Sequence, residues 1–183
     1  MLVYLAADDD MVRLLAEAFD KYHGSRLRKG DDAVRVSIIQ AWAKTDEDGN
    51  PVGAALKHHG VPCFAKVRIV NQRDRVNGLA DAEILVDGDA WPHLEIPQRL
   101  AIIDQQLTRI EPVCHDDTGL FKLDDCGRPK LKIRLPDYQI AGFHEVRERH
   151  GGDSLEHREI ATLFNELGQG VFAFVEQAQE QRA

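Results

Sequence analysis

The cysteines and histidines are the side chains of this sequence best suited to bind a metal. Cys114 and His115 precede two aspartates, and Cys126 follows a short way along the chain, so the three could meet at the base of a hairpin and hold zinc. Adjacent residues of a strand point to opposite faces, however, so Cys114 and His115 would diverge. The spacing of Cys63, Cys114 and Cys126 matches no common zinc module, and three free thiols indicate a reducing compartment. A zinc site on Cys114, His115 and Cys126 is therefore the less favoured hypothesis.

Other candidate chemical groups are isolated. His58 and His59 are adjacent, so they point in different directions on a helix or a strand, and a solvated helix end explains them more simply. Ser25, Ser37 and Ser154 lack the strand-turn-helix context of a nucleophile elbow. No glycine pattern typical of phosphate binding follows a predicted strand. The sequence therefore indicates neither a nucleophilic site nor a phosphate site.

The most informative stretch is a predicted helix over residues 96–111. Pro97 suits the first turn of a helix, where its missing N–H has no partner to lose. One apolar stripe recurs at helical spacing: Leu100, Ile103, Leu107 and Ile110. Gln105 and Arg109 lie with Ile102 on a second stripe, roughly opposite the first. A helix that is apolar on both sides is expected to be buried, so Gln105 and Arg109 mark either a functional site or the wet edge of a core helix.

The surrounding elements follow from hydrophobic periodicity and turn residues. An apolar stripe of Val12, Leu15, Phe19 and Tyr22 predicts a first helix, which Gly24 should end. Residues 124–129 are a predicted hairpin turn. We expect helices at 9–23, 52–59, 96–111 and 137–150, strands at 33–43, 64–70 and 82–86, hairpin strands at 120–123 and 130–135, and loops at 46–51 and 71–78.

This order of elements predicts an α+β protein, with a small mixed β-sheet packed by helices. A length of 183 residues accommodates one domain with a sizeable core, which we place at residues 1–152. Residues 153–183 then form a C-terminal amphipathic helical segment, which opens with a capping-box pattern and is interrupted at Gly168 and Gly170. This segment could pack on the domain or on a partner.

Four segments carry a resemblance to a known family. They are Leu100–Arg109 (LAIIDQQLTR), Asp125–Lys130 (DCGRPK), Pro136-Asp137-Tyr138 and Arg149-His150-Gly151. Together with the order of the elements, they resemble the metallopeptidases encoded by bacteriophages, which belong to the wider zincin and SprT-like group. The resemblance spans residues 9–152 and implies a zincin-like metallopeptidase scaffold.

The departures from the family pattern fall on its chemical positions. The family has two histidines one helical turn apart and a catalytic glutamate between them, where this chain has Gln105, Arg109 and Gln106. Pro136 takes the place of a third histidine. Glutamine is a poor zinc ligand and cannot accept a proton, and arginine brings a permanent positive charge. The resemblance therefore implies a pseudoenzyme without a catalytic residue, metal or cofactor. We expect Arg109 to pair with Asp137, because a buried guanidinium requires a carboxylate.

A net charge of −8 argues against direct binding to nucleic acid, which needs clustered lysines and arginines. An acidic surface could instead imitate a phosphate backbone and bind the basic groove of another protein. The candidate binding residues share acidic side chains in loops or at strand ends: Asp81, Glu83, Asp87, Asp89, Asp116, Asp117, Asp124 and Asp125. The chain lacks a signal-peptide pattern and an apolar run long enough to cross a bilayer, so we expect it in the cytoplasm.

The resulting functional hypothesis is an inactive, metallopeptidase-like phage protein that binds a host macromolecule. The specific form of this hypothesis is an inhibitor that presents a DNA-mimic surface to a nucleic-acid-handling enzyme. Two alternatives stay open: an active zinc-dependent peptidase with a relocated metal site, and a structural or assembly protein. The latter would self-associate, for example as a homodimer, through the apolar stripe over 160–178.

Overall fold

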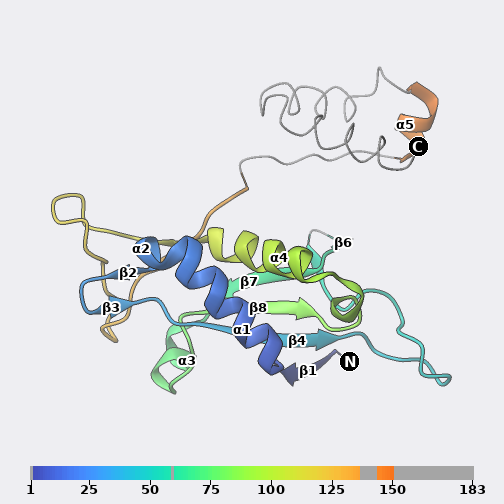
Figure 1. The fold of residues 1–183 in the computed structure, drawn as a ribbon, viewed down its shortest axis with the longest axis horizontal. Coiled ribbons are helices and arrows are strands. Elements are labelled where there is room, and N and C mark those ends of the chain that lie inside the picture. The colour runs from blue at the N-terminus through green and yellow to red at the C-terminus, as the bar shows by residue number, and fades with distance from the viewer. Residues whose placement is uncertain (1, 59, 137–143, 151–183) are drawn as a thin grey trace. The chain divides into compact units, whose positions relative to one another are not determined.

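The computed structural model describes residues 2–58, 60–136 and 144–150 (Figure 1). The chain divides into two compact units, Met1–Leu135 and Pro136–Ala183. Within the second unit the described element is the helix α5 (His144–His150). The expected segment at 153–183 and the first half of the expected 137–150 helix lie outside the described residues. Among the described helices, none combines the length and the apolar character needed to cross a membrane.

The first unit is built on a four-stranded mixed sheet with the order β1-β4-β8-β7. These strands are β1 (Val3–Ala6), β4 (Val36–Trp42), β8 (Ala82–Asp87) and β7 (Ala65–Ile69). β4 and β8 are parallel, with Ile38 opposite Ile84, whereas β1 and β7 run antiparallel to their neighbours. All six residues of β8 are buried, so this strand is covered on both faces. The expected small mixed sheet and the α+β class are confirmed.

Helices cover one face of this sheet (Figure 1). They are α1 (Asp9–Ala18), a π-helical turn η1 (Phe19–His23), α2 (Gly24–Leu27) and α4 (Ile96–Thr108). The main core joins Leu14 of α1 and Ile103 and Leu107 of α4 to Ile84 of β8. A smaller cluster contains Ala41, Leu56 and Leu85 and includes buried residues of the 43–56 segment. The helix predicted over 96–111 is a core helix, but it ends at Thr108, and Ile110 and Glu111 belong to a strand, β9 (Ile110–Pro112). The face with Ile103 and Leu107 is buried, whereas the second stripe is not, because Gln105 is exposed.

The first helix differs from its predicted pattern in phase and in length. Val12 and Tyr22 are exposed, whereas Met11, Leu14 and His23 are buried. In α1 the buried stripe is Met11, Leu14, Leu15 and Ala18, so the predicted stripe through Val12 is wrong. The π-helical turn η1 follows this helix, and its wider turn shifts the buried face by about one residue, so His23 is buried where Tyr22 was expected. The helical path also continues through Gly24 to Leu27, so the prediction that Gly24 ends it is wrong.

Three two-stranded sheets and two short helices complete the unit. The sheets pair β2 (Arg28–Lys29) with β3 (Asp32–Ala33), β5 (Lys57–His58) with β6 (Val61–Pro62), and β9 (Ile110–Pro112) with β10 (Leu131–Ile133). The short helices are α3 (Gln72–Val76) and the 3-10 turn η2 (Trp91–His93).

These small elements correct three local predictions. The helix expected at 52–59 is wrong, because the described part of this segment ends in β5. The loop expected at 71–78 contains α3, whose N-terminus is capped by the Asn71 side chain accepting from the Asp74 N–H. The predicted turn at 124–129 is present: Leu123 bridges Pro129, and Gly127 adopts a positive φ of 69°. The strand predicted at 120–123 is wrong, because this segment forms isolated bridges and β10 pairs with β9.

Two glycines offer a matched test of this packing. A Cβ added at Gly88 would lie 2.4 Å from Trp42 Cε2, and the Trp42 ring donates a hydrogen bond to Gln40. We therefore expect Gly88→Ala to lower the free energy of unfolding by about 1–3 kcal/mol. Gly24→Ala, at a helical position where the added Cβ would make only ordinary contacts, the nearest with Arg28 Nη1 at 3.7 Å, should raise it by about 0.5–1 kcal/mol. Urea unfolding of both variants measures the two signs, and a neutral Gly88→Ala would contradict this account.

Candidate functional site on helix α4

Helix α4 is fixed at its N-terminus by side chains from three elements. Glu95 and Gln98 form a capping box, and Pro97 occupies the first turn, as predicted. Arg99 donates to the Leu94 carbonyl at 2.9 Å, pairs with Asp10 of α1 at 3.3 Å and lies over the Trp91 ring. The N-terminal half of α4 is thus attached to α1. Positions 105, 106 and 109, where the family pattern has its chemical groups, follow at the C-terminal end of the helix.

Gln105, Gln106 and Arg109 lie in the C-terminal half of α4, in three different environments. Gln105 is exposed, Gln106 is buried and Arg109 is half-buried. The Gln106 amide nitrogen approaches Gln105 Oε1 at 3.5 Å, the limit of a hydrogen bond. Gln106 Oε1 and Arg109 Nε are both buried without a hydrogen-bond partner among the described residues. The Arg109–Asp137 pair stays a prediction, because Asp137 lies outside these residues.

The side chains present here do not fit a zinc ion. Gln105 and Arg109 share a helix face, as two histidine ligands would, but neither an amide nor a guanidinium is a good zinc donor. Gln106 cannot act as a general base, since an amide does not accept a proton at neutral pH. Pro136, the first residue of the second unit, offers no ligand and is exposed. The chemistry of this donor set therefore supports no metal-assisted hydrolysis.

A second polar cluster lies on the same helix, one residue before Gln105. Asp104 Oδ1 is 2.6 Å from His23 Nε2, and His23 Nδ1 is 2.8 Å from Arg26 Nη2. Arg26 also donates to the carbonyls of Leu107 and Ile110, at the end of α4. Burial lowers the pKa of the Arg26 guanidinium from its usual value, and the nearby Arg134 cation acts in the same direction. This cluster joins the π-helical turn to the C-terminal half of α4.

Cys63 lies close enough to this region to be influenced by its charges. Burial raises the pKa of the Cys63 thiol; the cations of Lys66 and Arg109 oppose this shift, and the Asp87 carboxylate adds to it. Because the thiolate is the reactive form, this shift disfavours a nucleophilic role for Cys63.

The alternative zinc site gains no support from the described geometry. Among residues 2–58, 60–136 and 144–150, no group of three or more His, Cys, Asp or Glu side chains could hold a metal ion. Cys126 Sγ accepts from the Gln72 amide at 3.4 Å, Cys114 Sγ lies 3.9 Å from the Pro112 carbonyl, and His115 is exposed.

Asp81 is completely buried and engaged by two guanidiniums. Its Oδ1 accepts from Arg75 Nε at 2.9 Å and Nη2 at 2.7 Å, and its Oδ2 accepts from Arg128 Nη2 and from the Arg35 N–H. Arg75 also pairs with Asp124 at 2.8 Å and donates to the Pro129 carbonyl. This network fastens the 124–129 turn and α3 to the start of β8.

Other candidate acidic residues are also structural. Glu83 is buried and pairs with Arg68 on the neighbouring strand at 2.7 Å. Asp87 is buried and accepts from the N–H groups of Asp89 and Ala90, and Asp89 accepts from the Ala43 N–H. The expectation that Asp81, Glu83 and Asp87 form an exposed binding surface therefore does not fit their burial. Paired strands and loop backbones supply their partners inside the molecule.

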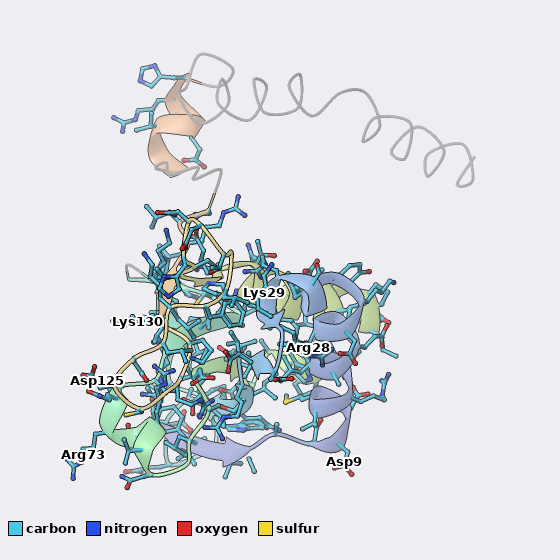
Figure 2. All side chains as sticks on the ribbon, turned by 90° about the vertical axis from the view of Figure 1, so that its left-hand side faces the viewer. Asp9, Arg28, Lys29, Arg73, Asp125 and Lys130 are labelled. Atoms are coloured by element: carbon cyan, nitrogen blue, oxygen red, sulfur yellow. The ribbon has the colours of Figure 1, made fainter. Side chains whose placement is uncertain are left out.

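Three candidate acidic residues remain on the surface. Asp116, Asp117 and Asp125 are exposed on the two turns between β9 and β10. Figure 2 shows the Asp125 side chain projecting outward beside α3, whose Arg73 also points to solvent. Asp124 is half-buried, because it pairs with Arg75 and accepts from the Arg128 N–H.

The polar residues that organise this region are difficult to predict from the sequence. His23 belongs to the Lys21-Tyr22-His23 triplet, but its buried position depends on the π-helical turn. Arg75 lies in a stretch that reads as a loop, six residues before Asp81, and Arg128 lies in the family-like turn. A usable signal was the coincidence of an arginine in a polar stretch with an aspartate directly before a mostly apolar strand.

The fold and the α4 positions define a metallopeptidase-like α+β protein. A sequence profile of the family described as putative phage metallopeptidase matches residues 5–168, most of the 183 residues, and the chain belongs to this family. No curated protein matches the chain, and no solved structure does.

The buried ion network predicts a large effect of removing one charge. Asp81→Asn would leave two guanidiniums near the sheet without their carboxylate, so we expect the free energy of unfolding to fall by about 3–5 kcal/mol. Asp125→Asn removes an exposed carboxylate from the same turn and should change it by less than about 0.5 kcal/mol. Urea denaturation compares the two variants. Equal stability of Asp81→Asn and Asp125→Asn would show that the network does not support the fold.

The His23 cluster predicts one tautomer of the imidazole. Arginine has only donors, so His23 Nδ1 must accept from Arg26, and the proton lies on Nε2, facing Asp104. Nitrogen-15 NMR at a pH where His23 is neutral should show a protonated Nε2 and a bare Nδ1. Arg26→Met alone should keep this tautomer, because the Asp104 carboxylate still needs a proton on Nε2, whereas the double variant Arg26→Met/Asp104→Leu should allow the other tautomer to appear. A protonated Nδ1 in the unmodified protein would contradict the arrangement.

Proposed function

We propose that this member of the phage metallopeptidase family is not a peptidase and acts by binding a host protein. The observation that carries the proposal is the set of side chains on α4: Gln105, Gln106 and Arg109 take the positions where the family pattern has histidine, glutamate and histidine. An amide, an amide and a guanidinium cannot supply both a metal site and a proton acceptor.

The way α4 is held supports a binding role. The helix is positioned by core residues such as Ile103 and Leu107, by Arg99 at its start and by the His23–Arg26–Asp104 cluster at its end. None of these contacts depends on a metal ion. The scaffold therefore holds its shape without the metal centre, as a protein that works through its surface requires.

The exposed part of the β9–β10 hairpin is the surface we assign to the partner. Asp116, Asp117 and Asp125 are exposed on its two turns, and loops are where binding residues concentrate on a rigid scaffold. The hairpin also carries exposed lysines, among them Lys130, which is labelled in Figure 2. A surface with both acidic and basic side chains suits a protein partner whose own surface carries both kinds of charge. A DNA-mimic surface for a nucleic-acid-handling enzyme would have to rely on Asp116, Asp117 and Asp125 alone.

Metal analysis of the purified protein tests the non-catalytic half of this proposal. We expect zinc well below one ion per chain after purification without chelator, and no cleavage of a denatured protein substrate when zinc is added. The restoring variant Q105H/Q106E/R109H serves as a comparison and should bind more zinc than the unmodified chain. Near-stoichiometric zinc in the unmodified protein, with hydrolysis that a chelator abolishes, would replace the proposal with a relocated peptidase site.

Affinity capture from host lysate tests the binding half. The triple variant D116N/D117N/D125N should lose the captured partner, because each change removes an exposed charge from the hairpin. The matched variant D31N/E47Q/D48N removes three exposed charges elsewhere and should keep it. Loss of the partner in both variants, or in neither, would show that the hairpin is not the binding surface.

A further inference from the structure

Strand β1 is the least protected element of the sheet. It lies at one end of the strand order, so one of its edges has no neighbouring strand among the described residues. Val3, Tyr4 and Leu5 expose 50%, 54% and 51% of their surface. In Figure 1 no ribbon of the described residues of the first unit lies beyond β1 on its outer side. An apolar edge strand with free backbone donors and acceptors is a template for pairing with another strand.

Both faces of β1 contribute apolar side chains. The register places Leu5 opposite Gln40 and Tyr4 opposite Ala41 of β4. Leu5 and Val3 thus share the face of Ile38, which packs on the helices, and Tyr4 shares the opposite face with Ala41. A new strand beside β1 would continue both faces and cover apolar surface on each.

The charges around β1 favour a second copy of this strand. Residues 2–7 carry no charge, so the strand lacks the lysine or glutamate that blocks edge pairing in many proteins. Exposed Asp9 follows its C-terminal end, and Figure 2 shows Asp9 pointing outward from the start of α1. Exposed Lys44 follows β4 at the N-terminal end of β1, where Val3 is opposite Trp42. Antiparallel pairing of two β1 strands brings the acidic end of each copy towards the basic end of the other.

We propose that two copies of the chain associate through antiparallel β1–β1 pairing, which joins two four-stranded sheets into one. In a strand, every second residue directs its N–H and C=O groups to the same neighbouring strand. Two residues that face each other across the new edge must therefore both have odd numbers or both have even numbers. The register with the greatest overlap of residues 2–6 places Tyr4 opposite Tyr4 and Val3 opposite Leu5. The pairing is isologous and closes at two copies. Because the strand is short, the association is weak and depends on concentration.

Light scattering of the full chain over a concentration series tests the association. We expect the mass to rise from one chain towards two. Val3→Lys places a charge in the new edge and should weaken the dimer by at least about tenfold. Val61→Lys is the matched control: Val61 is 66% exposed on β6, and the same substitution there should leave the dimer unchanged. Circular dichroism of both variants confirms that each is folded.

Oxidative cross-linking tests the register. Tyr4→Cys should form a disulfide between two copies, because the two positions face each other, whereas Val3→Cys should not. Peptide mapping separates this link from any formed by Cys63, Cys114 or Cys126. A chain that stays monomeric at every concentration overturns the proposal. So does a dimer that Val3→Lys leaves intact, which would locate the interface elsewhere, or a link at Val3 in place of Tyr4.

Discussion

One buried carboxylate, that of Asp81, connects three segments of the first unit that are well separated in the sequence. It is fully buried at the start of β8 and is satisfied by Arg75, Arg128 and the Arg35 N–H. A buried carboxylate is tolerated only when its charge and its lone pairs are both matched. Asp81 therefore fixes α3 and the 124–129 turn against the sheet, and the turn that most resembles the family is a structural feature of this protein.

The same reasoning separates the shape of α4 from its chemistry. Apolar burial and the His23–Arg26–Asp104 cluster position the helix, so its placement does not depend on what occupies positions 105, 106 and 109. Gln106 Oε1 and Arg109 Nε are buried without a hydrogen-bond partner among the described residues. An unsatisfied buried polar atom lowers stability by about 1–3 kcal/mol. This loss of stability arises at Gln106 and Arg109, where the family pattern has its chemical groups. Functional positions are where a sequence is expected to depart from the rules of local packing.

Hydrophobic periodicity predicted the central helix and the three main strands, because each is long or strongly apolar enough for tertiary contacts to agree with local pattern. Hydrophobic periodicity failed at His23, because a π-helical turn shifted the buried face of the helix. It also failed at β1, because all four residues of this strand are exposed and no alternation of apolar and polar residues results. It also failed for α3, a five-residue helix with four polar residues, which the Asn71 cap and the Arg75–Asp81 pair stabilise. The substituted positions on α4 were recognisable from the family pattern, whereas the environment of Gln106 and Arg109 required the packed structure.

The acidic composition illustrates why net charge does not describe a surface. Asp81, Glu83 and Asp87 contribute to the charge of −8, but they lie inside the molecule beside arginines or backbone N–H groups. Among the described residues, the exposed charges of the β9–β10 hairpin and the uncharged edge of β1 are two surfaces that stay available to other molecules. β10 contacts β7, and β7 and β1 lie at opposite ends of the strand order. Pairing through β1 would thus leave both hairpins free, at the two outer ends of an extended sheet.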